Sequence, residues 1–391
     1  MKKIKSFLSV ILAFAMLACV LVPAVSARTS DQADTRLQFN EDGKFRILQI
    51  ADIQDNPVLD AATRRLLIAG IESQKPDLIV LSGDNIAGYF CWTKLMAKAA
   101  IASYMDIFAG YGIPVAMVYG NHDDEATLAN KAYQMSVYES YPNFVGCRGE
   151  DSLSWYGTYS VPIYSSTDAN DIVFNVWMFD SGNYNDENGL GGYGCVHKDQ
   201  IEWYQRRSAE LKARNGGEPV PSILFQHIVV PEIWDALAEV PAGTANAIEH
   251  DGRYLALPDG STGELCEAPC PPKYSNGQFA ALRDGGDVIG MYFGHDHVNS
   301  WELEYQGVKL ATSPGCGFTS YGNGNRGFRV IDIDENDPWN YEDFLVDYAT
   351  LCPSELDACI FDIQANEVGF LAKIKAIFSL IPLLVRDLLA K

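Results

Sequence analysis

The chain has 391 residues, of which 20% are charged and 48% hydrophobic, a balance typical of a folded globular protein and not of a disordered one. Its 29 basic and 51 acidic residues give a formal net charge of −22, which argues against nucleic acid as a bulk partner. Long apolar runs occur only at the two ends, so a polytopic membrane protein is excluded.

The first 27 residues have the pattern of a secretory signal peptide. A basic stretch at residues 1–5 precedes an apolar run at 7–22, and small residues permit cleavage after Ala27. The alternatives are an uncleaved membrane anchor and lipid attachment at Cys19, which Leu17 and the continuing apolar run disfavour. We therefore expect a secreted, cell-surface or periplasmic protein.

Apolar, β-branched runs that end in polar clusters alternate with helical patterns over residues 28–345. Such runs suit strands buried on both faces of a sheet, and the alternation predicts an α/β domain. Strands are predicted at 45–50, 77–81, 113–119, 172–179, 222–225, 288–293, 308–311 and 328–333. Helices are predicted at 58–74, 93–109, 125–138 and 198–213, the first of them opened by Asn56 and Pro57. Stretches 181–195 and 241–278 are rich in Gly, Asn and Pro and are predicted to be surface loops.

A C-terminal extension, residues 346–391, contains a strongly apolar segment at 368–389. Its longest uncharged run has ten residues, 376–385, which is too short to span a bilayer. We expect a helix docked on the domain, with peripheral membrane or partner contact as the alternative. Cysteines leave two options open: Cys266 with Cys270 and Cys352 with Cys359 are close enough in sequence to pair, or the thiols are free.

Five predicted strands end in clusters of residues that can bind metal ions. The clusters contain Asp52 and Gln54, Asp84, Asn121 and His122, His227, and His295 and His297. The carboxyl ends of strands are where α/β sheets bind ligands. Carboxylate, imidazole and amide oxygen together suit borderline divalent metals, and a carboxylate such as that of Asp84 can bridge two of them.

Five ordered motifs in this chain resemble those of the calcineurin-like metallophosphoesterases, a superfamily that includes the purple acid phosphatases. The motifs are Asp52-Ile53-Gln54, Gly83-Asp84-Asn85, Gly120-Asn121-His122-Asp123, His227 and Gly294-His295-Asp296-His297. A weaker resemblance, to the Dcr2-like phosphatases, lies in the segment from Gly263 to Gly277 and the histidine cluster after it. The resemblance implies a four-layer α/β/β/α sandwich of two mixed sheets flanked by helices.

The resemblance also implies a role for each site residue. Asp52, Gln54, Asp84 and His297 would hold one metal ion, and Asp84, Asn121, His227 and His295 the other. The ions would clamp a phosphoryl group and activate a bridging hydroxide for attack on phosphorus. His122 would be the catalytic residue, protonating the leaving oxygen or, with Asn121, contacting the phosphoryl group.

Gln54 departs from the pattern, because the family usually has histidine there. An amide oxygen is a weaker and harder ligand than imidazole, so the first ion is expected to be held less tightly or to be Mn, Mg or Ca more often than Fe or Zn. The alternative is that Gln54 only hydrogen-bonds to a ligand.

The sequence therefore predicts an exported binuclear metal-dependent phosphoesterase acting on a small phosphorylated substrate. A monoesterase is favoured over a phosphodiesterase by the Dcr2-like resemblance alone. The rival from another class is a catalytically weak relative that binds a phosphorylated or sugar ligand in the same cleft. Substrate identity and oligomeric state are not predicted.

Overall fold

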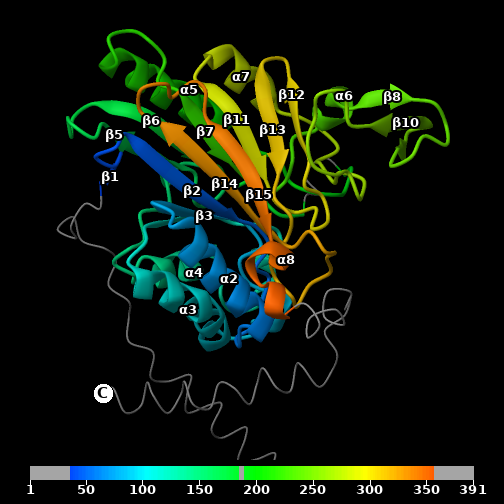
Figure 1. Ribbon diagram of the computed structural model, residues 1–391, viewed down its shortest axis with the longest axis horizontal. Coiled ribbons are helices and arrows are strands. Elements are labelled where there is room, and N and C mark those ends of the chain that lie inside the picture. The colour runs from blue at the N-terminus through cyan, green and yellow to red at the C-terminus, as the bar shows by residue number, and fades with distance from the viewer. Residues whose placement is uncertain (1–35, 185–188, 356–391) are drawn as a thin grey trace, which may run out of the picture. The chain divides into compact units, whose positions relative to one another are not determined.

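The computed structural model describes residues 36–184 and 189–355, and Figure 1 shows how their elements are arranged. The predicted signal peptide, Cys359 and the apolar segment 368–389 lie outside these residues, so the expectations about them stay predictions. Within the described ranges, no helix is both long and apolar enough to cross a bilayer.

One sheet has five strands in the order β15-β14-β2-β3-β4. Strands β2 (Lys44–Ile50), β3 (Leu78–Ser82) and β4 (Val115–Val118) are parallel, whereas β14 (Gly327–Asp334) runs antiparallel to β2 and β15 (Glu342–Asp347) antiparallel to β14. A hydrophobic core joins this sheet to three helices and the short α8. The helices are α2 (Ala61–Gln74), α3 (Lys94–Tyr111), α4 (Lys131–Tyr138) and α8 (Tyr348–Leu351).

The other large sheet has seven strands in the order β1-β5-β6-β7-β11-β13-β12. They are β1 (Leu37–Gln38), β5 (Tyr159–Tyr164), β6 (Ile172–Met178), β7 (Ser222–Phe225), β11 (Val288–Phe293), β12 (Glu302–Tyr305) and β13 (Val308–Thr312). A second core packs α5 (Lys198–Arg214) and α7 (Gln278–Gly285) against one face of this sheet. The parallel trio β6, β7 and β11 lies at its centre.

A third core fills the space between the two sheets. It contains Ile47 of β2 and Val80 of β3 together with Phe174 of β6 and Phe225 of β7. Helices therefore cover the outer faces and the sheets face each other, which confirms the four-layer α/β/β/α sandwich. All eight predicted strands are present, within a few residues of the expected ends.

Two helix starts were predicted wrongly. Helix α2 begins after Asp60, whose carboxylate accepts a hydrogen bond from the Ala62 N–H, and not at Asn56 and Pro57. The Asp55 carboxylate accepts the N–H groups of Asn56 and Asp60, and so folds this segment into a turn before the helix begins. Similarly, Asp123–Glu125 form a separate 3₁₀ turn, and α4 starts only after its cap.

The predicted loop 241–278 was also partly wrong. It contains β9 (Ile248–His250) and β10 (Arg253–Ala256), which with β8 (Ala238–Val240) form a small antiparallel sheet after the short helix α6 (Ile233–Ala236). These strands are too short and too polar for their periodicity to be recognised.

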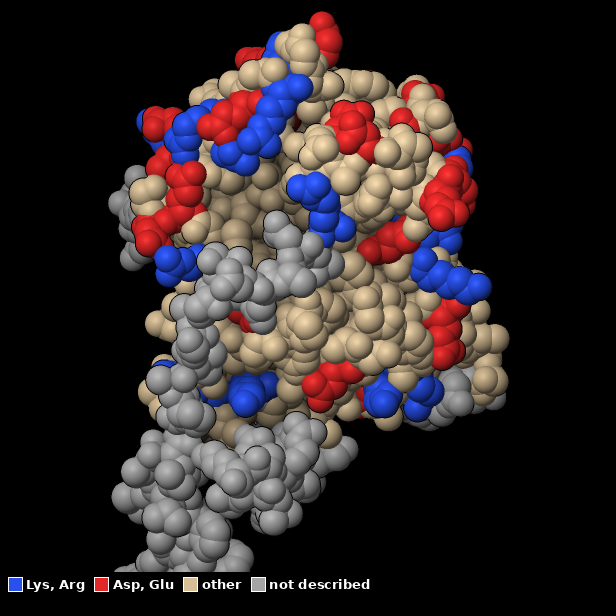
Figure 2. All heavy atoms as spheres, turned by 90° about the vertical axis from the view of Figure 1, so that its left-hand side faces the viewer, with Lys and Arg blue, Asp and Glu red and all other residues tan. Residues whose placement is uncertain are grey.

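On the face of the molecule shown in Figure 2, basic and acidic side chains are interspersed without a continuous basic stripe.

Candidate metal centre

The carboxyl ends of strands from both large sheets meet at one place. Strands β2, β3 and β4 of the five-stranded sheet lead into Asp52, Asp84 and Asn121, and β7 and β11 of the other sheet lead into His227 and His295. The sheets are joined here by hydrogen bonds, such as that from the His295 N–H to Asp52 Oδ2 at 3.1 Å.

Four of the eight predicted site residues have a positive φ angle, a backbone conformation that residues other than glycine rarely adopt. The φ angles are 52° for Asp52, 36° for Gln54, 49° for Asp84 and 75° for His295. Such strain persists only where the surroundings fix it, and it is concentrated at functional sites. Here the positive φ angles turn the backbone sharply just after each strand, so that the side chains point to a common centre.

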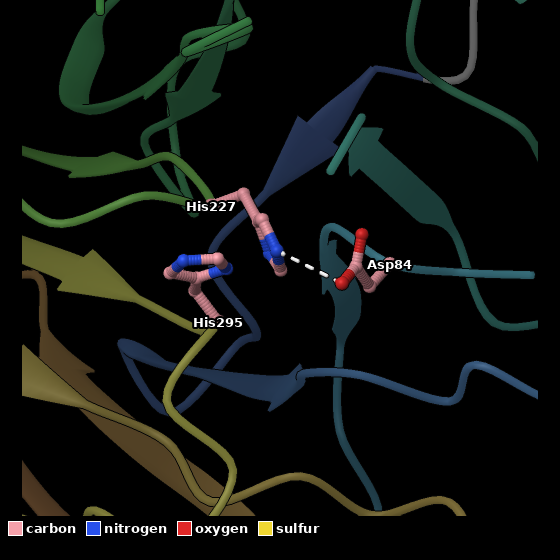
Figure 3. A group of neighbouring side chains, drawn as sticks. All are labelled: Asp84, His227 and His295. Carbon is pink, nitrogen blue, oxygen red and sulfur yellow. Dashed lines mark ion pairs between the residues drawn. The ribbon is translucent and has the colours of Figure 1, made fainter. Parts of the chain in front are cut away.

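Two overlapping groups of side chains have metal-ligand geometry. Asp84, His227 and His295 form the first, and each offers a ligand atom within 4.8 Å of the others. In Figure 3 the His227 ring points at Asp84, with 3.2 Å between His227 Nε2 and Asp84 Oδ2, and His295 lies beside it.

The second group consists of Asp52, Asp84 and His297, with His297 Nε2 3.3 Å from Asp52 Oδ1. Asp84 belongs to both groups, as expected for a carboxylate that bridges two ions. One of its oxygens is already committed, because Oδ1 accepts the His122 N–H at 2.8 Å. The other oxygen, Oδ2, is the one that faces His227.

Unpartnered polar atoms show that this centre fits metal ions. Buried side-chain oxygens and nitrogens without a hydrogen-bond partner normally cost about 1–3 kcal/mol each, so a cluster of them needs an explanation. Among the described residues the cluster consists of Asp52 Oδ1, Gln54 Oε1, Asp84 Oδ2, Asn121 Oδ1 and His227 Nε2. All five are atoms that the sequence-predicted ligands would direct at an ion.

Backbone carbonyls orient two of the imidazoles. His227 Nδ1 is 3.0 Å from the Ser82 carbonyl, and His297 Nδ1 is 2.9 Å from the Tyr321 carbonyl. A carbonyl only accepts, so each Nδ1 carries the proton and each Nε2 presents its lone pair to the centre. This arrangement is the usual one for a histidine that binds a metal through Nε2.

Asp123 ties two of the ligand loops together, a role that the sequence analysis missed. Its carboxylate accepts the N–H groups of Asn85 and Ile86 at 3.1 Å and that of Gly120 at 2.8 Å. Burial, and then the charge of Asp84, raise its pKa to about 7. Asp123 is the last residue of the Gly-Asn-His-Asp motif, so the sequence places it near the site. The sequence does not show that its side chain points inward.

Gln49 performs a similar task between the sheets. Its amide donates to Ser82 Oγ and to the Phe293 carbonyl, both at 3.0 Å, and so joins the ends of β3 and β11. The signal in the sequence is a glutamine between Leu48 and Ile50 of a predicted strand, and the structure shows that it is fully buried.

His122 lies beside the metal ligands and is held by Glu125. Its Nδ1 is 2.8 Å from Glu125 Oε2, and its Nε2 is 4.0 Å from Asp84 Oδ2. Burial lowers the pKa of His122, but the hydrogen bond to Glu125 and the charge of Asp84 outweigh burial and leave the pKa above its ordinary value. The proton-bearing Nδ1 thus faces Glu125, and Nε2 faces the centre.

Arg326 is buried, and its guanidinium donates to the carbonyls of Gly317 and Ser320, which supports the loop that carries Tyr321. Cys266 and Cys270 are exposed free thiols and do not form the local pair considered above.

A family model described as Calcineurin-like phosphoesterase matches residues 45–299. The relative "Probable inactive purple acid phosphatase 14" of Arabidopsis thaliana is 28% identical over 82% of this chain and 80% of its own length. "Phosphatase DCR2" of Saccharomyces cerevisiae is 27% identical over 71% of this chain but only 48% of its own length. A crystal structure of a dimetal phosphatase from Danio rerio aligns at 13% identity and a TM-score of 0.46, over 78% of this chain and 99% of that one.

Proposed function

Because the chain belongs to the calcineurin-like phosphoesterase family, we propose that it is an exported, binuclear metal-dependent phosphoesterase that acts on phosphomonoesters. One observation carries the proposal: Asp84 is shared by two ligand groups, and its Oδ2 is one of five buried polar atoms at the centre that have no hydrogen-bond partner. Two divalent ions bound here would give each of these atoms a partner.

The ligand sets proposed from the sequence are compatible with this geometry. Asp52, Gln54, Asp84 and His297 would hold one divalent ion, and Asp84, Asn121, His227 and His295 the other. The donors suit Mn, Zn, Fe, Co, Mg or Ca, and Gln54 favours the harder ions in the first position. When bound, two such ions supply Lewis acidity for a phosphoryl group and lower the pKa of water into the physiological range.

His122 would hold a proton at Nε2 and give it to the departing alkoxide oxygen. Glu125 fixes the ring by accepting from Nδ1 and keeps the imidazolium favourable, which a general acid requires. Asn121 would bind the phosphoryl group and an ion through its amide, whose Nδ2 donates to Tyr184 Oη at 3.1 Å.

A second candidate function is binding of a phosphorylated ligand with little or no turnover. Two observations favour it: the Arabidopsis relative carries "probable inactive" in its name, and Gln54 replaces the family's usual histidine. The presence of His122 and of every other predicted ligand supports the enzyme instead.

Purified protein should be assayed with an aryl phosphate and a bis-aryl phosphodiester, with and without added Mn, beside elemental analysis. Turnover of the monoester supports the proposal, and turnover of the diester alone makes the protein a phosphodiesterase. Two bound metals with neither reaction make it a binding protein. Detection of the chain outside the cytoplasm, cleaved after Ala27, tests export.

A further inference from the structure

Four tyrosines surround the metal centre and take no part in the proposed chemistry. Two of them meet histidines edge-on: the Tyr89 ring lies 5.5 Å from that of His122, and the Tyr193 ring 4.3 Å from that of His295, centroid to centroid. We call the set the tyrosine collar. Its members are Tyr89, Tyr184, Tyr193 and Tyr321.

The other two tyrosines complete the collar from different loops. Tyr321 stacks on His297 with centroids 4.1 Å apart and an interplanar angle of 10°. Tyr184 accepts from Asn121 Nδ2 and stacks on Tyr193 at 5.6 Å. Every member therefore contacts a predicted site residue or another member that does.

The collar is solvent-accessible although it touches a buried centre. Tyr89 is 36% exposed, Tyr184 50% and Tyr321 38%. Ring surface of this kind, directly beside the group that would protonate a leaving oxygen, is available to a molecule bound at the metals. Tyr89 is the member whose ring lies against His122, the residue proposed to protonate that oxygen.

The charge around the collar is acidic. Glu125 accepts from Tyr184 Oη at 3.2 Å, and Glu267 accepts from Tyr321 Oη at 3.1 Å. In the described part of the chain, no Lys or Arg hydrogen-bonds or pairs with any of the eight predicted site residues. The buried Lys131 is held by Asp180 at 2.7 Å.

We infer that the tyrosine collar is a leaving-group subsite that selects phosphomonoesters of uncharged, ring-bearing alcohols and disfavours esters with a second anionic group, such as nucleoside polyphosphates. The inference rests on the proposed function in placing the phosphoryl group at the metals. Aromatic pairs prefer edge-to-face or offset contact, which the exposed collar rings can offer. A second phosphate or carboxylate beyond the ions would meet Glu125 or Glu267, and neither glutamate pairs with a Lys or Arg of the described residues.

Calorimetric titration of the Mn-supplemented protein with non-hydrolysable phosphonates tests the subsite without requiring turnover. The probes are methylphosphonate, benzylphosphonate and 4-carboxybenzylphosphonate. We expect benzylphosphonate to bind about 10-fold more tightly than methylphosphonate, as for one or two aromatic contacts. The added carboxylate should cost about 3-fold in affinity, the repulsion expected roughly 7 Å from a glutamate at the dielectric constant of water.

Tyr89→Ala should remove most of the benzyl advantage, leave methylphosphonate affinity unchanged, and be rescued by Tyr89→Phe. Trp339→Ala is the matched control, because Trp339 is also an exposed aromatic residue, with 43% of its surface accessible. It follows strand β14, whose last residue, Asp334, pairs with Lys44 at the start of β2, whereas Asp52 follows the other end of β2. Equal affinity for the methyl and benzyl probes, no binding of any probe, or tightest binding of the carboxybenzyl probe would each overturn the inference. Selective benzyl binding without aryl phosphate turnover would instead refute the proposed function and leave the subsite standing.

Discussion

Asp84→Asn is the substitution that most directly probes the shared centre. The change keeps the side chain's shape and one acceptor oxygen but removes the negative charge that both ligand groups use. If Asp84 bridges two ions, both should be lost together. Asp52→Asn is the matched control, because Asp52 belongs to only one of the groups and should affect one ion.

The size of the effect follows from Coulomb's law. A single negative charge about 4 Å from a dication contributes about 2 kcal/mol even at the dielectric constant of water, which is about 30-fold in affinity. Asp84 is 1% exposed, so the true loss is larger than this lower bound for each ion. We therefore expect Asp84→Asn to weaken both sites by more than about 30-fold.

The assay is elemental analysis after dialysis against a metal buffer, with circular dichroism as the check on folding. The expected content is two ions in the wild type, one in Asp52→Asn and none in Asp84→Asn. If folded Asp84→Asn retained one ion while Asp52→Asn retained none, Asp84 would not be the shared ligand, and the binuclear arrangement would have to be redrawn.

Three further outcomes are expected. Gln54→His should tighten the weaker ion and raise its preference for Zn over Mg, measured by competition titration; unchanged preference would mean that Gln54 is not a ligand. Glu125→Gln should lower kcat more than it changes KM or metal content, because the carboxylate orients His122 and raises its pKa but belongs to neither ligand group; an unchanged kcat would remove Glu125 from the mechanism. Asp343→Asn should cost about 3–5 kcal/mol in guanidinium unfolding at pH 7, since the carboxylate pairs with buried Arg329 and lies 2.5 Å from Lys309 Nζ. Burial raises the pKa of Asp343, but Arg329 and Lys309 lower it to about 2, so this stability is present above about pH 4 and lost as the pH falls through about 2; a deficit that does not shrink in acid would refute the pairing.

The sequence by itself determined the strands and the residues at their ends. Runs such as Ser222–Phe225 and Val288–Phe293 are continuous and apolar, so their bounds were predicted without error, and the histidines after them could be identified from their order. The layer arrangement was predicted from the family resemblance and not from hydrophobic periodicity, because periodicity does not show how two sheets pack on each other.

Only the tertiary structure decided what surrounds those residues. The tyrosine collar comes from three segments far apart in the chain, because Tyr184 and Tyr193 lie close together in sequence. Nothing in the sequence around Tyr89 or Tyr321 marks either one as a neighbour of a histidine. The same holds for Asp123 and Arg326, whose inward directions depend on loops folding over one another. The local sequence pattern determines which residues follow the end of a strand. Contacts between distant loops are set by the packing of the whole domain, which depends on residues throughout the chain.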